Sequence, residues 1–319
     1  TNKKMKACSC SNTLNNTGTP SCQPLMKVAK KYMFVPTYDS TGVRNKIAVA
    51  TVLSQAVLDA LINNVDKTKR WYPSPELENI TGERSESTYD TAASGKKSLV
   101  QQGIRSVAAE IYEQGAEYKY QLDALSCNET SVYIVDAEGS IFGMVPATED
   151  GYLYPIRLDK ASFDARLIFP TDTTVGKIAL SFDFKRTEDD ALIRTIAGSD
   201  ITADLLNAEG LLDISAEYSS ITTTGVTITL SERFGSRKQK NRLSGLLISE
   251  FFSAVGGTAS RLWNVTTATA VTIATFTESS SGVYVLTFAA QTPTNVIRVT
   301  PVKATFDFAD VTANTFLIP

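Results

Sequence analysis

The sequence contains no histidine among its 319 residues. Histidine is the side chain whose ordinary pKa lies nearest neutrality, so its absence removes the commonest general acid and base. Ser-His-Asp and Cys-His nucleophiles and histidine metal ligands are removed with it. Every catalytic class that depends on a histidine side chain is therefore excluded before any motif is examined.

The usual catalytic and nucleotide-binding motifs are also missing. The patterns G-x-S-x-G, H-E-x-x-H, G-x-G-x-x-G and Walker A do not occur. The string Ser94-Gly-Lys-Lys-Ser98 fails as a phosphate-binding loop, because Asp90 stands where the first glycine would be required. The chain has 34 acidic residues, so a glycosidase pair of carboxylates is not excluded, but nothing singles out one pair. We expect no enzymatic activity and no cofactor.

Cysteine is scarce and badly spaced for a metal site. The four cysteines are Cys8, Cys10, Cys22 and Cys127. A zinc site of four cysteines usually presents two C-x2–4-C pairs, which these positions do not form. We therefore expect no metal, and free thiols or an adventitious disulfide remain open.

Long hydrophobic runs are absent too. No apolar segment approaches the ~20 residues needed to cross a bilayer, and the polar start Thr1-Asn-Lys-Lys is not followed by the apolar core of a signal peptide. We expect synthesis in a cytoplasm and no membrane partner. The net charge of −3 does not suggest a basic DNA-binding surface over the whole chain.

What the sequence does contain is alternation. In 177–185, Ile178, Leu180 and Phe182 alternate with polar or small residues, the period of a strand with one buried face. Ala165, Leu167 and Phe169 repeat the pattern. We expect one meandering sheet from four segments: 132–136, 152–158, 165–169 and 177–185.

The segments before this sheet add two helices and three strands. Residues 1–24 are polar and form an N-terminal arm with little core of its own. We expect strands at 28–36, 76–80 and 104–112, and helices at 51–64 and 115–126. The stripe Tyr118, Leu122 and Leu125 predicts that the second helix covers the sheet.

Residues 81–102 are polar and separate two strands that we expect to pair. A connection of this length is uncommon in a compact domain unless it is functional or disordered. The alternatives are a loose surface loop and an arm that contacts a partner. Further on, the adjacent acids Glu188, Asp189 and Asp190 favour a solvated turn over a cation site, and residues 191–204 make a plausible linker.

From Gly210 the composition shifts to Thr, Ser, Val and Ile, as in a second domain of short strands. Segments at 212–218, 226–230, 246–254, 270–277, 283–289 and 295–301 predict an immunoglobulin-like sandwich without its disulfide. One basic run interrupts it and is either a solvated loop or a contact for an acidic partner. Its charged residues are Arg233, Arg237, Lys238, Lys240 and Arg242.

The order of elements resembles the tail tube protein of long-tailed bacteriophages: a strand, a long excursion, a strand, a helix and then a meander. The part after Gly210 resembles immunoglobulin-like domains fused to phage tail and capsid proteins. Two stretches, Thr17-Gly-Thr-Pro-Ser-Cys22 and residues 171–184, are similar to structural proteins of phages of Bacteroidetes. We therefore expect a mainly β fold: a tail-tube-type β-sandwich or barrel with a packed helix in 25–209, and an immunoglobulin-like β-sandwich in 210–319.

The resemblance implies a virion tail protein, assembled in the host bacterial cytoplasm, that forms stacked hexameric rings. Its partners would be its own copies, other tail proteins and genomic DNA, which passes through the lumen without sequence-specific binding. The excursion would reach the next ring. Its candidate contact residues are Glu83, Arg84, Glu86, Tyr89, Asp90, Lys96 and Lys97.

Two other functions stay open. One is a capsid decoration or head–tail connector protein that displays the C-terminal sandwich. The other is a carbohydrate-binding adhesin that uses Trp71 or Trp263, the only two tryptophans, as aromatic platforms.

Overall fold

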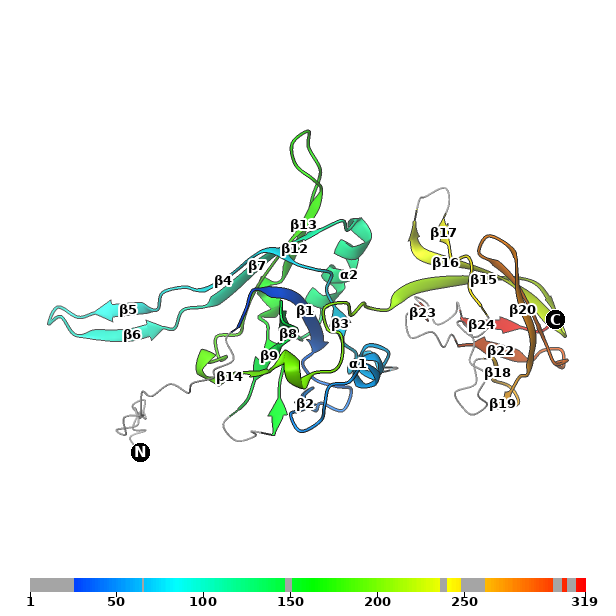
Figure 1. The fold of residues 1–319 in the computed structure, drawn as a ribbon, viewed down its shortest axis with the longest axis horizontal. Coiled ribbons are helices and arrows are strands. Elements are labelled where there is room, and N and C mark those ends of the chain that lie inside the picture. Colours follow the sequence, from blue (N-terminus) through cyan, green and yellow to red (C-terminus); the bar gives the residue numbers. More distant parts are fainter. Residues whose placement is uncertain are drawn as a thin grey trace, which may run out of the picture.

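The computed structural model describes residues 26–64, 66–146, 151–235, 240–247, 262–300, 306–308 and 314–319. The predicted arm at 1–24 lies outside them. The described chain is mainly β, with two α-helices and several sheets. We call residues 26–211 the N-terminal part and residues 212–319 the C-terminal part; they occupy the two sides of Figure 1.

The N-terminal part contains two facing sheets. The first sheet has the order β14-β9-β8-β1-β3, with β11 paired to β8. Its strands are Ile193–Ile196 (β14), Ile141–Met144 (β9), Thr130–Asp136 (β8), Ala29–Pro36 (β1), Tyr72–Pro73 (β3) and Ile156–Arg157 (β11). The second sheet has the order β12-β13-β7-β4. Its strands are Asp164–Ile168 (β12), Lys177–Asp183 (β13), Arg105–Tyr112 (β7) and Glu78–Arg84 (β4).

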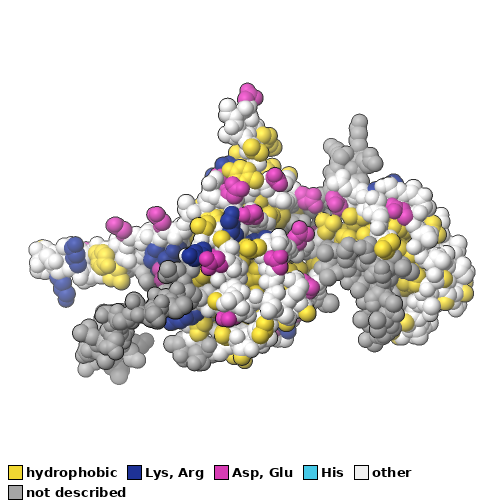
Figure 2. All heavy atoms as spheres, viewed as in Figure 1, with side chains coloured by type: hydrophobic (Ala, Val, Ile, Leu, Met, Phe, Trp, Pro, Cys, Tyr) yellow, Lys and Arg dark blue, Asp and Glu magenta, His cyan; other side chains and the backbone are white. Residues whose placement is uncertain are grey.

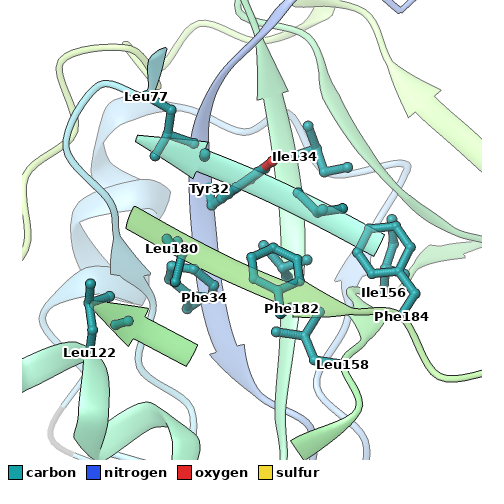
Figure 3. Packing of buried hydrophobic residues seen from close by; sticks show 14 of the residues in the cluster. Tyr32, Phe34, Leu77, Leu122, Ile134, Ile156, Leu158, Leu180, Phe182 and Phe184 are labelled. Atoms are coloured by element: carbon teal, nitrogen blue, oxygen red, sulfur yellow. The ribbon is translucent and has the colours of Figure 1, made fainter. Parts of the chain in front are cut away.

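An aromatic cluster holds these sheets together. Phe182 of β13 packs edge-on against Tyr32 of β1, with ring centroids 5.5 Å apart, and stacks on Phe163 at 6.0 Å. Figure 3 shows Tyr32 and Phe182 between the strands. The inward residues of β13 are fully buried while their neighbours are half-buried, which confirms the alternation expected there. Leu122 adds to this core from α2 (Ala116–Ser126), so the prediction of a covering helix is confirmed.

The first sheet is buried on both faces. Met33, Val35 and Tyr133 point away from the aromatic cluster into a second cluster with α1 (Gln55–Ile62), which is shorter than the helix expected at 51–64. Two-sided burial explains why β8 is buried at every position and shows no period of two. Two small pairs complete this part: β10 (Tyr152–Leu153) with β2 (Ile47–Ala48), and β5 (Thr88–Thr91) with β6 (Lys97–Gln101).

The prediction of one meandering sheet was wrong. The segment at 132–136 belongs to the first sheet and the segments at 165–169 and 177–185 to the second. The segment at 152–158 splits into β10 and β11. The reason is physical: strands with one apolar face need a second sheet to cover that face, and consecutive segments supply both layers. Within the described residues neither sheet closes into a barrel.

The expected linker at 191–204 is instead part of the N-terminal fold. β14 pairs with β9, and Ile201 and Leu205 are buried under the first sheet. Two short 3-10 helices flank β14, Asp190–Leu192 (η2) and Gly198–Asp200 (η3), and a third, Lys160–Ser162 (η1), precedes β12. The buried Lys31 fixes the end of this segment, because its Nζ donates to the carbonyl oxygens of Leu206 (2.8 Å) and Ala208 (2.5 Å).

The C-terminal part is a sandwich of two sheets around a separate core. One sheet has the order β20-β21-β16-β15-β23, with β17 paired to β16, and the other has the order β19-β18-β22-β24. The strands of the first are Ile273–Ser280 (β20), Val283–Phe288 (β21), Gly225–Gly235 (β16), Leu212–Thr222 (β15), Phe306–Phe308 (β23) and Lys240–Arg242 (β17). Those of the second are Thr269–Ala270 (β19), Leu262–Asn264 (β18), Val296–Val299 (β22) and Thr315–Leu317 (β24).

Several strands of this sandwich were predicted and several were missed. The strands expected at 270–277 and 283–289 are confirmed as β20 and β21, which pair as a hairpin that Gly282 turns with φ +68°. The strands β17, β18, β23 and β24 were not predicted. The strand expected at 246–254 lies largely outside the described residues, and its described residues, Leu246 and Leu247, are not in a strand.

Candidate functional site

The most conspicuous surface feature is a two-stranded ribbon. β4 and β7 pair inside the second sheet, and their chain continues outward as β5 and β6. Figure 1 shows this ribbon projecting at one end of the molecule, opposite the C-terminal part. Every residue from 88 to 102 is exposed. The excursion at 81–102 is therefore a hairpin with its own strands, and pairing of its flanking strands is confirmed.

The ribbon carries apolar side chains into solvent. Tyr89 and Leu99 lie directly opposite each other across the two strands and are 56% and 58% exposed. Val100 is 65% exposed, and Figure 2 shows hydrophobic side chains on this arm. A lone two-stranded hairpin is at best marginally stable in water. Exposed apolar residues on such an arm are typical of a surface that becomes buried against a partner.

The charged candidates divide into an exposed group and one residue at the base. Five of them, one on β4 and four beyond Arg84, have exposed side chains and no ion pair within the described part of the chain: Glu83, Glu86, Asp90, Lys96 and Lys97. The tip is a turn in which Gly95 adopts φ +79° and the Ala92 N–H donates to the Lys96 carbonyl oxygen at 2.9 Å. The string 94–98 is thus a hairpin turn leading into a strand.

Arg84 is not a free contact residue, because its guanidinium binds within its own chain. Its Nε and Nη2 donate to the two carboxylate oxygens of Asp190, each at 2.9 Å. Arg105, its cross-strand neighbour, donates to the same two oxygens at 2.8 and 3.3 Å. Burial alone would raise the pKa of Asp190, but the hydrogen bonds and charges of both arginines outweigh it and lower that pKa.

The neighbouring acid Glu188 extends this network. Glu188 is buried and accepts a hydrogen bond from Arg157 of β11, which also donates to Thr187 at 3.0 Å. The prediction of a solvated turn at 188–190 was therefore wrong for Glu188 and Asp190, while Asp189 is exposed and caps η2. Spacing in the sequence could not predict these ion pairs, because the arginine partners of Asp190 lie 106 and 85 positions away from it.

A second hairpin that the sequence did not single out also exposes apolar residues. Between β12 and β13, Phe169 is 76% exposed and Val175 is 69% exposed. Phe169 was expected to point inward with Ala165 and Leu167, but β12 ends at Ile168 and the alternation ends with it. Figure 2 shows hydrophobic side chains on this hairpin, below its acidic tip.

The basic run lies on a hairpin of the C-terminal sheet and not in a plain loop. Arg233 belongs to β16 and Lys240 to β17, whereas Arg237 and Lys238 lie outside the described residues. Arg242 donates to the Ser281 carbonyl oxygen at 3.4 Å. Contact with an acidic partner stays a prediction.

The two tryptophans do not form a pair of sugar platforms. Trp71 is 3% exposed and packs on Tyr133 with ring centroids 5.0 Å apart, so it cannot face a ligand. Trp263 is half-buried in β18 of the other part. Trp71 therefore cannot serve as the aromatic platform that the adhesin hypothesis requires.

A groove of about 1950 Å³ runs between α2, the segment 206–213 and the C-terminal sheet. Glu117, Asp213 and Glu232 are among the residues that line it. The pKa of Glu117 is raised mainly by its partial burial, and the negative charges of Glu232 and Asp213 raise it further. The groove is therefore acidic on the side where the two parts meet.

Other classes of site find little support in the described ranges. No group of three His, Cys, Asp or Glu side chains there could hold a metal ion. Cys127 is an exposed free thiol, and the other three cysteines lie in the undescribed N-terminal segment. Neither described helix has the length and apolar character needed to span a bilayer. No protein-family model, curated protein or solved structure matches this chain.

Proposed function

We propose that this chain is a virion structural protein, a tail tube subunit that assembles into stacked hexameric rings and encloses the path of the genomic DNA. The observation that carries the proposal is the projecting ribbon, whose residues 88–102 are all exposed and include Tyr89, Leu99 and Val100. An arm without a core of its own gains apolar burial only against another molecule. A second copy, in the next ring, supplies that surface.

Open sheet edges support lateral assembly. In the second sheet β4 and β12 are the outermost strands among the described residues. Such edges present unpaired backbone groups that another strand can satisfy. Pairing of β4 in one copy with β12 in the next repeats around a ring, because a heterologous contact closes when its rotation divides a full turn.

The outer face of that sheet has a composition that suits a DNA path. Register places small residues, among them Ser106, Ala108 and Ser181, on this face. Its two basic residues are already paired, Lys177 with Glu110 and Arg166 with Asp164. Further carboxylates on the face are Glu83 and Asp183. Free cations bind phosphates and slow DNA, so a face of this kind lets DNA slide.

Electron microscopy of the purified protein tests the proposal. We expect six-fold rings that stack into tubes. Twelve-fold rings would favour a head–tail connector, and binding at capsid-lattice positions a decoration protein with its C-terminal sandwich outward. Either result would contradict the tube.

A shortened ribbon tests the role of the arm. Replacing residues 88–101 by Asn-Gly retains Arg84 and the bond from the Gly103 N–H to Ser87 Oγ, and gives the new hairpin a suitable turn. We expect folded subunits that no longer form tubes. The matched control, Ala93→Ser in the tip, should assemble normally. Tubes of normal length from the shortened protein would refute this role.

A further inference from the structure

The ribbon is long and attached at one end, so a small change of angle at its base moves its tip by several ångströms. Ala93 at the tip lies nine positions beyond Arg84, which at about 3.3 Å per residue corresponds to roughly 30 Å. A tilt of about 10° at the base would move the tip by about 5 Å over that length. Docking at a defined place therefore needs a fixed base.

Backbone pairing between the two strands does not by itself fix the direction of the ribbon. Residues 88–102 are exposed, so no core packing from the rest of the fold restrains the arm. At the base the two strands approach so closely that a Cβ on Gly103 would lie 1.7 Å from the Ser85 carbonyl oxygen. Only glycine fits there, and it provides no side chain to pack against the body.

Polar contacts supply the restraint instead. Arg84 and Arg105 face each other across β4 and β7, and both bind the carboxylate of Asp190 with two nitrogens each. Each arginine also reaches the opposite strand. Arg84 Nη1 donates to the Gly103 carbonyl oxygen at 3.0 Å, and Arg105 Nη1 donates to that of Gly82 at 2.9 Å.

A second set of bonds ties this point to the other sheet. Arg84 Nη2 donates to the Glu188 carbonyl oxygen at 3.1 Å, and the Glu188 carboxylate binds Arg157 of β11. The turn at 188–190 therefore joins both ribbon strands to both sheets of the N-terminal part. We call Arg84, Arg105, Glu188, Asp190 and Arg157 the clasp.

We infer that Asp190 is a positioning residue, which sets the direction of the ribbon by binding both of its strands at the base. Two forked arginine contacts need a carboxylate, because each guanidinium presents donors only. An asparagine at position 190 would have nearly the same shape as the aspartate but only one acceptor oxygen. Its amide NH₂ group would face the guanidinium groups of Arg84 and Arg105. The clasp pre-organises the arm, so that little orientational freedom is lost when the tip docks.

Distance measurements by pulsed electron spin resonance test this in unassembled protein. Spin labels are placed at Ala93→Cys in the tip and Lys160→Cys in the body, with the four native cysteines replaced by serine. We expect a narrow distance distribution in the parent and, in Asp190→Asn, one at least roughly twofold broader, since both charge-assisted forks are lost. The control Asp189→Asn makes the same change of charge one residue away and should match the parent.

Arg105→Gln gives a second reading that does not alter the turn. It should broaden the distribution less than Asp190→Asn, because Arg84 keeps its fork. Circular dichroism shows whether each variant folds. Distributions equally narrow in the parent, Asp190→Asn and Arg105→Gln would overturn the inference.

The consequence for assembly rests on the proposed function, but the stiffness of the ribbon does not. If the chain forms tubes, Asp190→Asn should raise the protein concentration needed for assembly by about tenfold, from the added orientational cost. A chain that never forms tubes would refute the proposed function and leave the distance result standing. Tubes formed equally well by a variant with a broadened distribution would refute the role of the clasp in assembly.

Discussion

Two carboxylates of this chain experience opposite surroundings. Asp190 lies between two arginines, which lower its pKa despite burial. Glu117 is half-buried near Glu232 and Asp213, and burial together with these like charges raises its pKa. The two arginines favour the charged form of Asp190. Burial and the neighbouring carboxylates disfavour the charged form of Glu117.

Glu117→Gln should therefore stabilise the protein at neutral pH. A carboxyl whose pKa is raised on folding stabilises the fold at low pH, and that contribution is lost as the pH rises through its folded pKa. Because burial and the nearby carboxylates disfavour the charged form of Glu117 in the folded protein, the neutral variant should melt higher at pH 7, by roughly 1 °C for a partly exposed group. Near pH 4, where glutamate is largely protonated folded or unfolded, the difference should shrink. Melting curves at both pH values check this, and a variant that melts lower at pH 7 would contradict it.

At the scale of elements, the β12–β13 hairpin is a second arm that exposes apolar residues. Like the ribbon, it extends from an edge of the second sheet, because β12 and β4 are the two outer strands of that sheet. Its exposed Phe169 is a large aromatic side chain, and aromatic side chains contribute strongly to the energetics of protein interfaces. We expect this hairpin to contact a neighbouring copy beside the ribbon.

Phe169→Ser should weaken assembly without weakening the fold. The side chain is 76% exposed, so its loss should change the melting temperature by about 1 °C or less. If it anchors an interface, the concentration for half-assembly should rise about tenfold or more. Sedimentation velocity measures this, with Thr173→Ser in the same loop as the control. Unchanged assembly of Phe169→Ser would remove the hairpin from the interface.

At the scale of the whole molecule, the described core divides into two regions that share no residue. The clusters on either face of the first sheet draw on residues from Ala29 to Leu211. The cluster of the C-terminal sandwich draws on residues from Leu212 to Ile318. This change of core lies beside the predicted domain boundary at 209/210.

Separate cores predict two unfolding transitions in calorimetry. Phe182→Ala, at a 1% exposed site, should cost about 3–5 kcal/mol and lower one transition by roughly 10 °C. Leu286→Ala, at a fully buried site of the other core, should lower only the other transition. A single transition that both variants lower equally would show one cooperative unit.

Local patterns in the sequence were enough to predict the local features of the fold. Alternation predicted β13 and the apolar stripe with Leu122 predicted α2, because each pattern depends on residues near in the chain. The sequence also predicted the ribbon as a connection between paired strands. The mainly β class followed from these elements, while the tube function came from a resemblance and stays a proposal.

The contacts between residues that are far apart in the chain could be read only from the folded molecule. The tertiary structure divided the predicted meander between two sheets, buried Trp71, and turned Arg84 from an expected contact residue into part of the base of the ribbon. Periodicity reports that a strand has an apolar face, but not which sheet covers that face. An ion pair such as Arg84–Asp190 joins positions 106 apart, and no local pattern encodes that distance, because the partners are brought together by the packing of every element between them.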